Sequence, residues 1–396
     1  MQIYADNAAT TKISQNALQA MMPYYEEIYG NPSSLHSAGQ QVAAALTNAR
    51  AKCAELLGCS LQEITFTSGG SEADNTAILS AAALGEKQNK RHIISTAFEH
   101  HAVLHTLDVL KRRGFEITLL DVHENGLITP EEVAAAIRPD TCLVTVMYAN
   151  NEIGTVEPIA EIGEVCKKAN VIFHTDAVQA AGHLKIDVKA QNIDMLSLSA
   201  HKFHGPKGVG LLYSRRGIRL TPLINGGAQE RGIRAGTENL PGIIGMTAAF
   251  EEALEKLDEK NKKLYGMRNR LIEGIGEIPH SILNGDLENR LPGNVNFCFE
   301  GIEGESLLLL LDDKGICASS GSACTSGSLD PSHVLLAIGR PHEIAHGSLR
   351  LSISDENTPE EIEYIIRSVK EVVEYLRGFS PVWRDLESGK RKFILE

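Results

Sequence analysis

The chain has 396 residues, of which 43% are hydrophobic and 22% are charged. This length exceeds what one simple hydrophobic core holds, so we expect two domains. Acidic residues outnumber basic ones by 51 to 38, and the formal charge of −13 argues against nucleic acid or an anionic membrane as the primary ligand, because both would repel the protein.

The first two thirds of the chain alternate between helical and strand patterns, which is typical of a mostly parallel sheet with crossover helices. The expected strands are residues 64–67, 93–95, 115–120, 143–148, 171–175, 195–198 and 209–213. Residues 71–84 and 159–169 are expected helices. The predicted fold class is therefore α/β, with a large domain built on a mostly parallel seven-stranded sheet.

A change of pattern follows the long amphipathic stretch 243–278, which we expect to be one helix that leaves the large domain. The later segments 293–299, 306–312, 348–354 and 359–377 show strand and helix patterns in a different order. They indicate a smaller α+β domain that the N-terminal segment joins. We expect the large domain at residues 15–260 and the small domain at residues 1–14 and 261–396.

Location and redox state follow from what the chain lacks. No segment approaches about 18 uninterrupted apolar residues, and the N-terminus has no basic and apolar regions of a signal peptide. The seven cysteines are scattered and odd in number, which fits reduced thiols better than a disulfide framework. We therefore expect a cytoplasmic protein, with Cys53, Cys142, Cys166 and Cys298 in the core.

Two expected strands deliver reactive polar side chains at their ends, Asp176 after 171–175 and Lys202 after 195–198. The turn from Thr67 through Gly69 and Gly70 opens a helix, and such a turn favours an anion. A lysine for a Schiff base, a carboxylate for a ring nitrogen and a phosphate turn are what pyridoxal 5′-phosphate needs. Singly, each has a structural explanation: a surface lysine, a helix cap or buried ion pair, and an ordinary turn.

Cys324 differs from the other cysteines because its neighbours, residues 320–328, are small and turn-prone. Nothing there would pack a buried thiol, so we expect an exposed loop whose reactive cysteine can carry a sulfur atom. Cys317, seven residues earlier, leaves a metal-binding cysteine pair as an alternative.

A second alternative comes from His342-Glu343-Ile344-Ala345-His346, which matches the H-E-x-x-H pattern of zinc proteases. That pattern requires both histidines on an established helix. Here Pro341 opens and Gly347 closes a single turn, and a strand pattern follows at once. A zinc hydrolase is therefore the weaker interpretation.

Five segments carry a resemblance to a known family. They are Asp6-Asn7-Ala8-Ala9-Thr10-Thr11, Gly30-Asn31-Pro32-Ser33-Ser34-Leu35-His36, Asn150-Asn151-Glu152-Ile153-Gly154, Ser199-Ala200-His201-Lys202 and Ser319-Ser320-Gly321-Ser322-Ala323-Cys324-Thr325-Ser326. Over nearly its whole length the chain resembles the class I cysteine desulfurases of the NifS/IscS type, in the class V aminotransferase family. The resemblance implies a homodimer with the aspartate aminotransferase fold, which is fold type I of the pyridoxal phosphate enzymes. It also implies conversion of L-cysteine to L-alanine, with the sulfur held as a persulfide on Cys324.

The same resemblance implies roles for individual residues. Lys202 would form the Schiff base, Asp176 would bind the pyridine nitrogen, and His100 would stack on the ring and move protons near the sulfur. Asn151 and Gln179 would bond the 3′ oxygen, and the phosphate donors would be Gly70, Ser71, Ser199, His201 and Thr237 of the partner subunit. Arg350 would hold the substrate carboxylate bidentately, with Asn31 nearby. Cys324 would also serve as a transient ligand of an iron–sulfur cluster.

Acceptor proteins such as an iron–sulfur scaffold are the implied partners, and nitrogenase, general iron–sulfur assembly and RNA thiolation are open destinations. The tail from Ser380 is short, so its docking to a scaffold is open too. A selenocysteine lyase, another lyase or an aminotransferase would use the same cofactor site without requiring Cys324. A non-enzymatic sulfur-relay scaffold would keep the Cys324 loop and tolerate loss of the cofactor.

Overall fold

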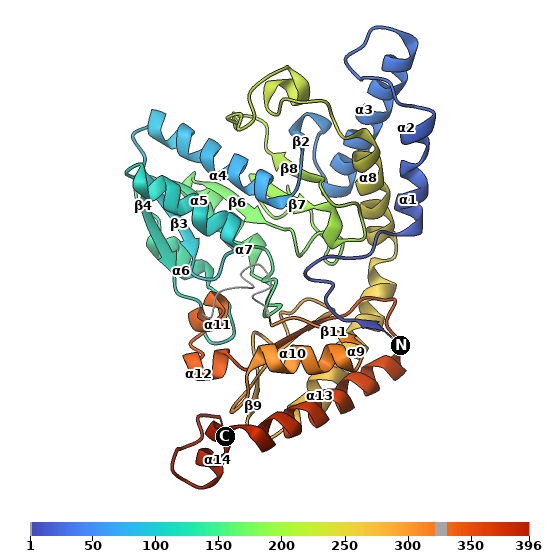
Figure 1. Cartoon of the computed structure of the whole chain (residues 1–396). Helices are drawn as coiled ribbons and strands as arrows, with labels where there is room; N and C mark the ends of the chain where they lie inside the picture. Colours follow the sequence, from blue (N-terminus) through green and yellow to red (C-terminus); the bar gives the residue numbers. More distant parts are fainter. Residues whose placement is uncertain (1, 321–330, 396) are drawn as a thin grey trace.

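The computed structural model describes residues 2–320 and 331–395, so Cys324 lies outside the described residues (Figure 1). The largest sheet has seven strands in the order β2-β8-β7-β6-β5-β3-β4. Their bounds are β2 Ile64–Thr67, β3 His92–Thr96, β4 Glu116–Leu120, β5 Thr141–Thr145, β6 Ile172–Asp176, β7 Met195–Ser199 and β8 Gly210–Ser214. Only β8 runs antiparallel to its neighbours. The predicted α/β class with a mostly parallel sheet is confirmed.

Helices cover both faces of this sheet. On one face lie α4 (Gly70–Lys87) and α5 (His101–Arg112), whose alanine and leucine side chains form a core with strand residues such as Leu143 and Leu212. On the other face lie α3 (Ser37–Leu57), α7 (Ile159–Ala169) and α8 (Leu240–Glu255). Because both faces are covered, the central strands are buried along their whole length.

The predicted single helix over 243–278 is wrong in one respect. The chain forms α8 and then α9 (Leu257–Gly276), which meet at Lys256, whose backbone (φ −98°, ψ 8°) leaves the helical conformation. The break separates two burial patterns. Met246 and Phe250 of α8 pack in the large-sheet core, whereas Leu271 and Ile275 of α9 pack in a second core.

The second core belongs to a smaller set of elements, which Figure 1 shows below the large sheet, with the N-terminus beside them. It contains the antiparallel sheet β12-β10-β9 and the parallel pair β1-β11. The bounds are β1 Ile3–Tyr4, β9 Ser281–Leu283, β10 Asn294–Phe299, β11 Ile316–Cys317 and β12 Ser348–Ser352, with α10 Gly304–Asp313 and α13 Pro359–Phe379 packed beside them. The domain limits expected from the sequence stay a prediction.

Shorter helices complete the chain: α1 Gln15–Met21, α2 Pro23–Glu26, α6 Pro130–Ala136, α11 His333–Ala337, α12 His342–Ala345 and α14 Pro381–Glu387. Within the part of the chain that the structure describes, no helix is long and apolar enough to cross a bilayer. Cys53, Cys142, Cys166 and Cys298 are buried, as predicted, and the six described cysteines are all free thiols.

Candidate active site

A cavity of about 460 Å³ lies beside the carboxyl ends of β6 and β7 and the N-terminus of α4. In sheets with parallel strands, the crevice outside these strand ends is the usual ligand site. The lining residues are Ala8, Ala9, Gly70, Ser71, Asp74, His100, Met147, Asn151, Asp176, Val178, Gln179, Ser199, His201, Lys202 and Arg350. Ten of the predicted site residues are therefore together on one wall, although they come from distant parts of the sequence.

Lys202 ends the short 3-10 turn Ala200–Lys202 that follows β7. Its Nζ donates hydrogen bonds to the carbonyl oxygens of Ala8 at 2.6 Å and Ala9 at 2.9 Å. The carbonyl of Lys202 accepts a hydrogen bond from His183 Nε2 at 3.0 Å, and burial lowers the pKa of that histidine to about 4. The amine is thus held at the cavity by the N-terminal segment, with a neutral imidazole fixing its backbone.

Asp176 is the last residue of β6 and is buried, with 5% of its surface exposed. Burial raises the pKa of its carboxyl group, while His100, the N–H of Val178 and Lys202 act in the opposite direction. The Val178 N–H donates to Asp176 Oδ1 at 2.9 Å. These neighbours are the groups that favour an ionised carboxylate in a buried place.

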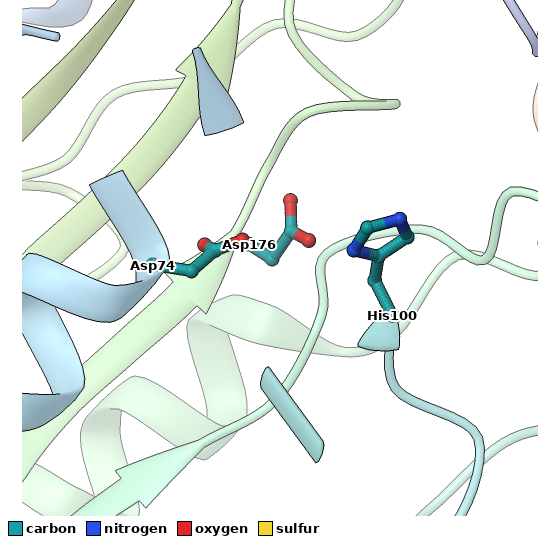
Figure 2. A group of neighbouring side chains, drawn as sticks. All are labelled: Asp74, His100 and Asp176. Atoms are coloured by element: carbon teal, nitrogen blue, oxygen red, sulfur yellow. The ribbon is translucent and has the colours of Figure 1, made fainter. Parts of the chain in front are cut away.

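His100 caps the N-terminus of α5, and its Nδ1 accepts a hydrogen bond from the N–H of Ala102 at 3.1 Å. Burial lowers the pKa of this imidazole, so the neutral ring carries its proton on Nε2. One ligand atom from each of His100, Asp74 and Asp176 lies within 4.8 Å of the others. Figure 2 shows the Asp176 carboxylate pointing toward the imidazole, with Asp74 approaching from α4.

The glycine turn at the start of α4 forms part of the cavity wall. A Cβ atom at Gly70 would lie 2.6 Å from Val178 Cγ2, so only glycine fits here without a shift. Ser71 and Ser199 add hydroxyl groups to the same wall. Burial lowers the pKa of His201 to about 4, so it faces the cavity as a neutral ring. Backbone N–H groups at a helix start, hydroxyls and a neutral imidazole form a donor set that suits a phosphate.

Arg350 lies in the middle of β12 and is only 2% exposed. Its Nη2 donates to Asp6 Oδ1 at 2.8 Å and its Nη1 to the carbonyl of Asn151 at 3.1 Å. Its buried Nε has no hydrogen-bond partner among residues 2–320 and 331–395. A buried guanidinium with a donor to spare is suited to an anionic group.

Two predicted residues are not part of this wall. Asn31 is exposed in the loop between α2 and α3 and is not on the cavity wall, so its role near Arg350 stays a prediction. Its Oδ1 accepts the N–H of Ser33 at 2.9 Å, which shapes that loop instead. Thr237 is also exposed, in the loop before α8, and its role across a subunit interface stays a prediction.

Sequence reasoning missed Asp74, Asp6 and the carbonyl groups of Ala8 and Ala9 as parts of the site. Asp74 carried a signal, since it stands four residues after Gly70 and beside Ala73 on the apolar face of its helix. The partnership of Asp6 with Arg350 joins residues 344 positions apart and had no local signal.

The zinc-hydrolase interpretation finds no support. His342 and His346 lie with ring centroids 4.7 Å apart at the four-residue helix α12. The one group of three metal-capable side chains within the described ranges is Asp74, His100 and Asp176. The histidine pair therefore has no third ligand there.

Comparisons with known proteins agree with this geometry. The family described as aminotransferase class-V matches residues 3–365. A Clostridium botulinum (strain Hall) protein named cysteine desulfurase IscS is 53% identical over 394 residues, which cover 99% of each chain. A protein of the same name from Methanosarcina thermophila is 53% identical over 96% of this chain and 94% of its own. A solved NifS-like protein is 39% identical, with a TM-score of 0.89 over 95% of this chain and 100% of its own. The structure of SspA in complex with cysteine is 37% identical, with a TM-score of 0.80 over 90% of this chain and 99% of its own.

Proposed function

We infer the roles of the site residues from one premise: this chain belongs to the class V aminotransferase family and is a cysteine desulfurase. The family implies pyridoxal 5′-phosphate as cofactor, and the donor set of the cavity fits it. Gly70, Ser71 and Ser199 line one end of the cavity for the phosphate. Lys202 and Asp176 are the lysine and the buried carboxylate for its aldehyde and ring nitrogen. The observation that carries the proposal is that these groups share one cavity with Arg350.

When bound, pyridoxal phosphate supplies an electron-poor ring that accepts the electron pair released at the substrate Cα. Asp176, ionised, would hold the proton of the ring nitrogen. Asn151 and Gln179 bind the 3′ oxygen, and Gln179 is already oriented because its Nε2 donates to the carbonyl of Ala8 at 3.0 Å. Lys202 Nζ would take the Cα proton and later return a proton to Cα, so that alanine is complete.

Arg350 binds the substrate carboxylate. Its Nε is the donor that the described protein leaves without a partner, and Asp6 and the Asn151 carbonyl fix the plane of the guanidinium. In this proposal the amino acid binds with its carboxylate against β12 and its side chain toward the remaining cavity wall. His100 Nε2–H is the proton donor for the substrate end that carries sulfur.

Cys324 takes the sulfur. Its thiolate attacks the substrate sulfur, an S–S bond forms and the Cβ–S bond breaks. The Cβ atom keeps the electron pair of that bond and is protonated to the methyl group of alanine, which leaves a persulfide on Cys324. Burial raises the pKa of the thiols of Cys53 and Cys142 to about 11, and of Cys59, Cys166 and Cys298 to about 12. These five thiols are therefore unsuited to the reaction.

The finer assignments belong to the same proposal. We propose a homodimer, supported by the exposed apolar residues Tyr25, Tyr29 and Leu35 on and after α2. We also propose that the persulfide passes to acceptor proteins such as an iron–sulfur scaffold, with Cys324 as a transient cluster ligand. Free thiols throughout the described chain support a reducing compartment such as the cytoplasm.

Two variants test the proposal. Cys324→Ala should retain the bound cofactor and its visible absorbance but release no alanine from cysteine, while the matched control Cys317→Ala should keep turnover. Lys202→Ala should lose the covalent attachment that borohydride reduction and peptide mapping detect at residue 202. Normal alanine release by Cys324→Ala would refute the persulfide route. Selenocysteine turnover without Cys324 would favour a lyase, and sulfur transfer without cofactor would favour a relay scaffold.

A further inference from the structure

Three buried carboxyl groups lie close together beside the cavity. Asp74 on α4 is 1% exposed, Asp176 at the end of β6 is 5% exposed, and Glu99, just before α5, is 0% exposed. An oxygen of Asp74 lies within 4.8 Å of an oxygen of Asp176, as Figure 2 illustrates. Two negative charges at this separation repel strongly when water is excluded. The pair therefore favours a single negative charge, with one proton retained.

The surrounding groups do not supply the positive charge that two carboxylates would require. On β6, burial lowers the pKa of His174 to about 3, and at the start of α5 burial lowers that of His100, so both rings are neutral. Burial raises the pKa of Glu99 to about 8, so this third acid is mostly neutral near neutral pH. The positive charge of Lys202, after β7, lowers the pKa of Asp176.

The contacts of the two aspartates decide which one keeps the proton. Asp176 accepts the Val178 N–H at 2.9 Å and is favoured in its ionised form by this hydrogen bond and by Lys202. Asp74 Oδ1 has no hydrogen-bond partner among the residues described. The ring nitrogen nearest to it is His174 Nε2 at 3.7 Å.

The side chains around Asp74 form a series of hydrogen bonds in which no group needs to be charged. His174 Nδ1 is bonded to the hydroxyl of Thr145 at 2.8 Å, and its Nε2 to the hydroxyl of Ser197 at 3.0 Å. Burial and the nearby Asp176 raise the pKa of Asp74 well above its ordinary value, and the hydroxyl of Ser197 acts only in part against them. The neutral acid is thus the form that this pocket accommodates.

We propose that Asp74 is a positioning residue that keeps its proton in the working enzyme, so that the negative charge of the pair stays on Asp176. An aspartic acid next to an aspartate then holds the charge where the ring nitrogen is to be bound. The part of this inference that concerns the cofactor rests on the proposed function of Asp176. The protonation of Asp74 does not, because it follows from the protein alone.

Infrared spectroscopy of the Asp74→Asn variant tests the protonation directly. An amide has nearly the shape of the neutral acid and cannot ionise. We expect the C=O stretching band of a protonated carboxyl group in the wild-type protein near neutral pH, and its loss in Asp74→Asn. Glu99→Gln is the matched control, because it removes a second buried acid with a raised pKa and identifies its band separately. Thermal unfolding monitored by circular dichroism verifies that both variants fold.

A second readout uses the holoenzyme. The pH titration of the visible cofactor band should be the same in Asp74→Asn as in the wild type. If Asp74 is instead ionised in the wild type, the change to asparagine removes a negative charge. The titration would then shift to lower pH by on the order of one unit or more, a tenfold change in the acid dissociation constant. Either that shift or an infrared difference spectrum of wild type minus Asp74→Asn that contains no lost carboxyl C=O band would overturn the proposal. Failure of the protein to bind cofactor would count against the proposed function alone, since the infrared result is obtained without cofactor.

Discussion

Gly70 and Val178 offer a sharp test of how the phosphate end of the cavity is built. A methyl group at position 70 would lie 2.6 Å from Val178 Cγ2, well inside van der Waals contact, and 3.8 Å from the Cβ atom of Ser199, which is an ordinary contact. The conflict therefore concerns one side chain. Overpacking of this kind costs about 1–3 kcal/mol. The gain in helix propensity from glycine to alanine offsets up to about 1 kcal/mol of it.

We therefore expect Gly70→Ala to lower the free energy of unfolding by about 1–2 kcal/mol and to weaken cofactor binding, because the first turn of α4 must move. Val178→Ala alone should cost about 1 kcal/mol through lost apolar burial. The double variant should be more stable than the sum of the two changes predicts, by about 1–2 kcal/mol, because the truncated side chain makes room for the new methyl group.

Urea unfolding of the cofactor-free protein measures the four members of this cycle, and titration with pyridoxal phosphate measures the affinity. Gly266→Ala is the matched control, since Gly266 lies within α9 and a Cβ atom there would meet nothing within 4 Å. This control should raise stability by about 0.5–1 kcal/mol. If Gly70→Ala behaves like Gly266→Ala, or if Val178→Ala brings no rescue, the steric argument is refuted.

Two further predictions concern the buried charges. Burial holds the pKa of Glu99 at about 8 in the folded chain, above its ordinary value of 4.5. The stabilisation from the neutral carboxyl group is therefore complete below pH 4.5 and is lost as the pH rises toward the folded pKa. Relative to Glu99→Gln, wild-type stability should fall by about 1.4 kcal/mol per pH unit in that window, and parallel urea midpoints at about pH 5.5 and 7.5 for the two proteins would contradict it. Arg350→Lys should raise the KM for cysteine about tenfold or more with the cofactor spectrum unchanged, because one ammonium group cannot serve Asp6, the Asn151 carbonyl and a substrate carboxylate together. An unaltered KM in steady-state assays would place the carboxylate site elsewhere.

Much of the large sheet could be predicted because its signals are local. The strand at 64–67 and the helix at 159–169 form over the predicted residues, since each apolar run is bounded by polar or turn-forming residues. The end of α8 was missed because Lys256 interrupts a helical pattern that continues on both sides. The break arises from tertiary structure, as α8 and α9 pack into different cores.

In the site, too, the residues with local sequence signals could be predicted and those placed by tertiary structure could not. Lys202 and Asp176 could be paired from the sequence because ends of neighbouring parallel strands meet at one edge of a sheet. The choice between His100 and His101 came from the family resemblance alone, since adjacent histidines have the same composition signal. In the structure His100 lines the cavity, while His101 is the first residue of α5 and is not on the wall. Which of the two histidines faces the cavity depends on the path of the chain between β3 and α5, which no local pattern specifies.

The pairing of β1 with β11 has a consequence for how the protein is made. Ile3 lies beside Ile316, and Asp6 binds Arg350, so the segment whose carbonyl groups hold Lys202 is fixed by residues that leave the ribosome near the end of synthesis. The strands from β2 to β8 are all translated long before these late partners emerge. A nascent chain can therefore assemble the large sheet before the partners of its N-terminal segment have been synthesised. We therefore expect the lysine pocket to close late in synthesis, and ribosome-stalled chains that end before β11 should expose an unclosed pocket.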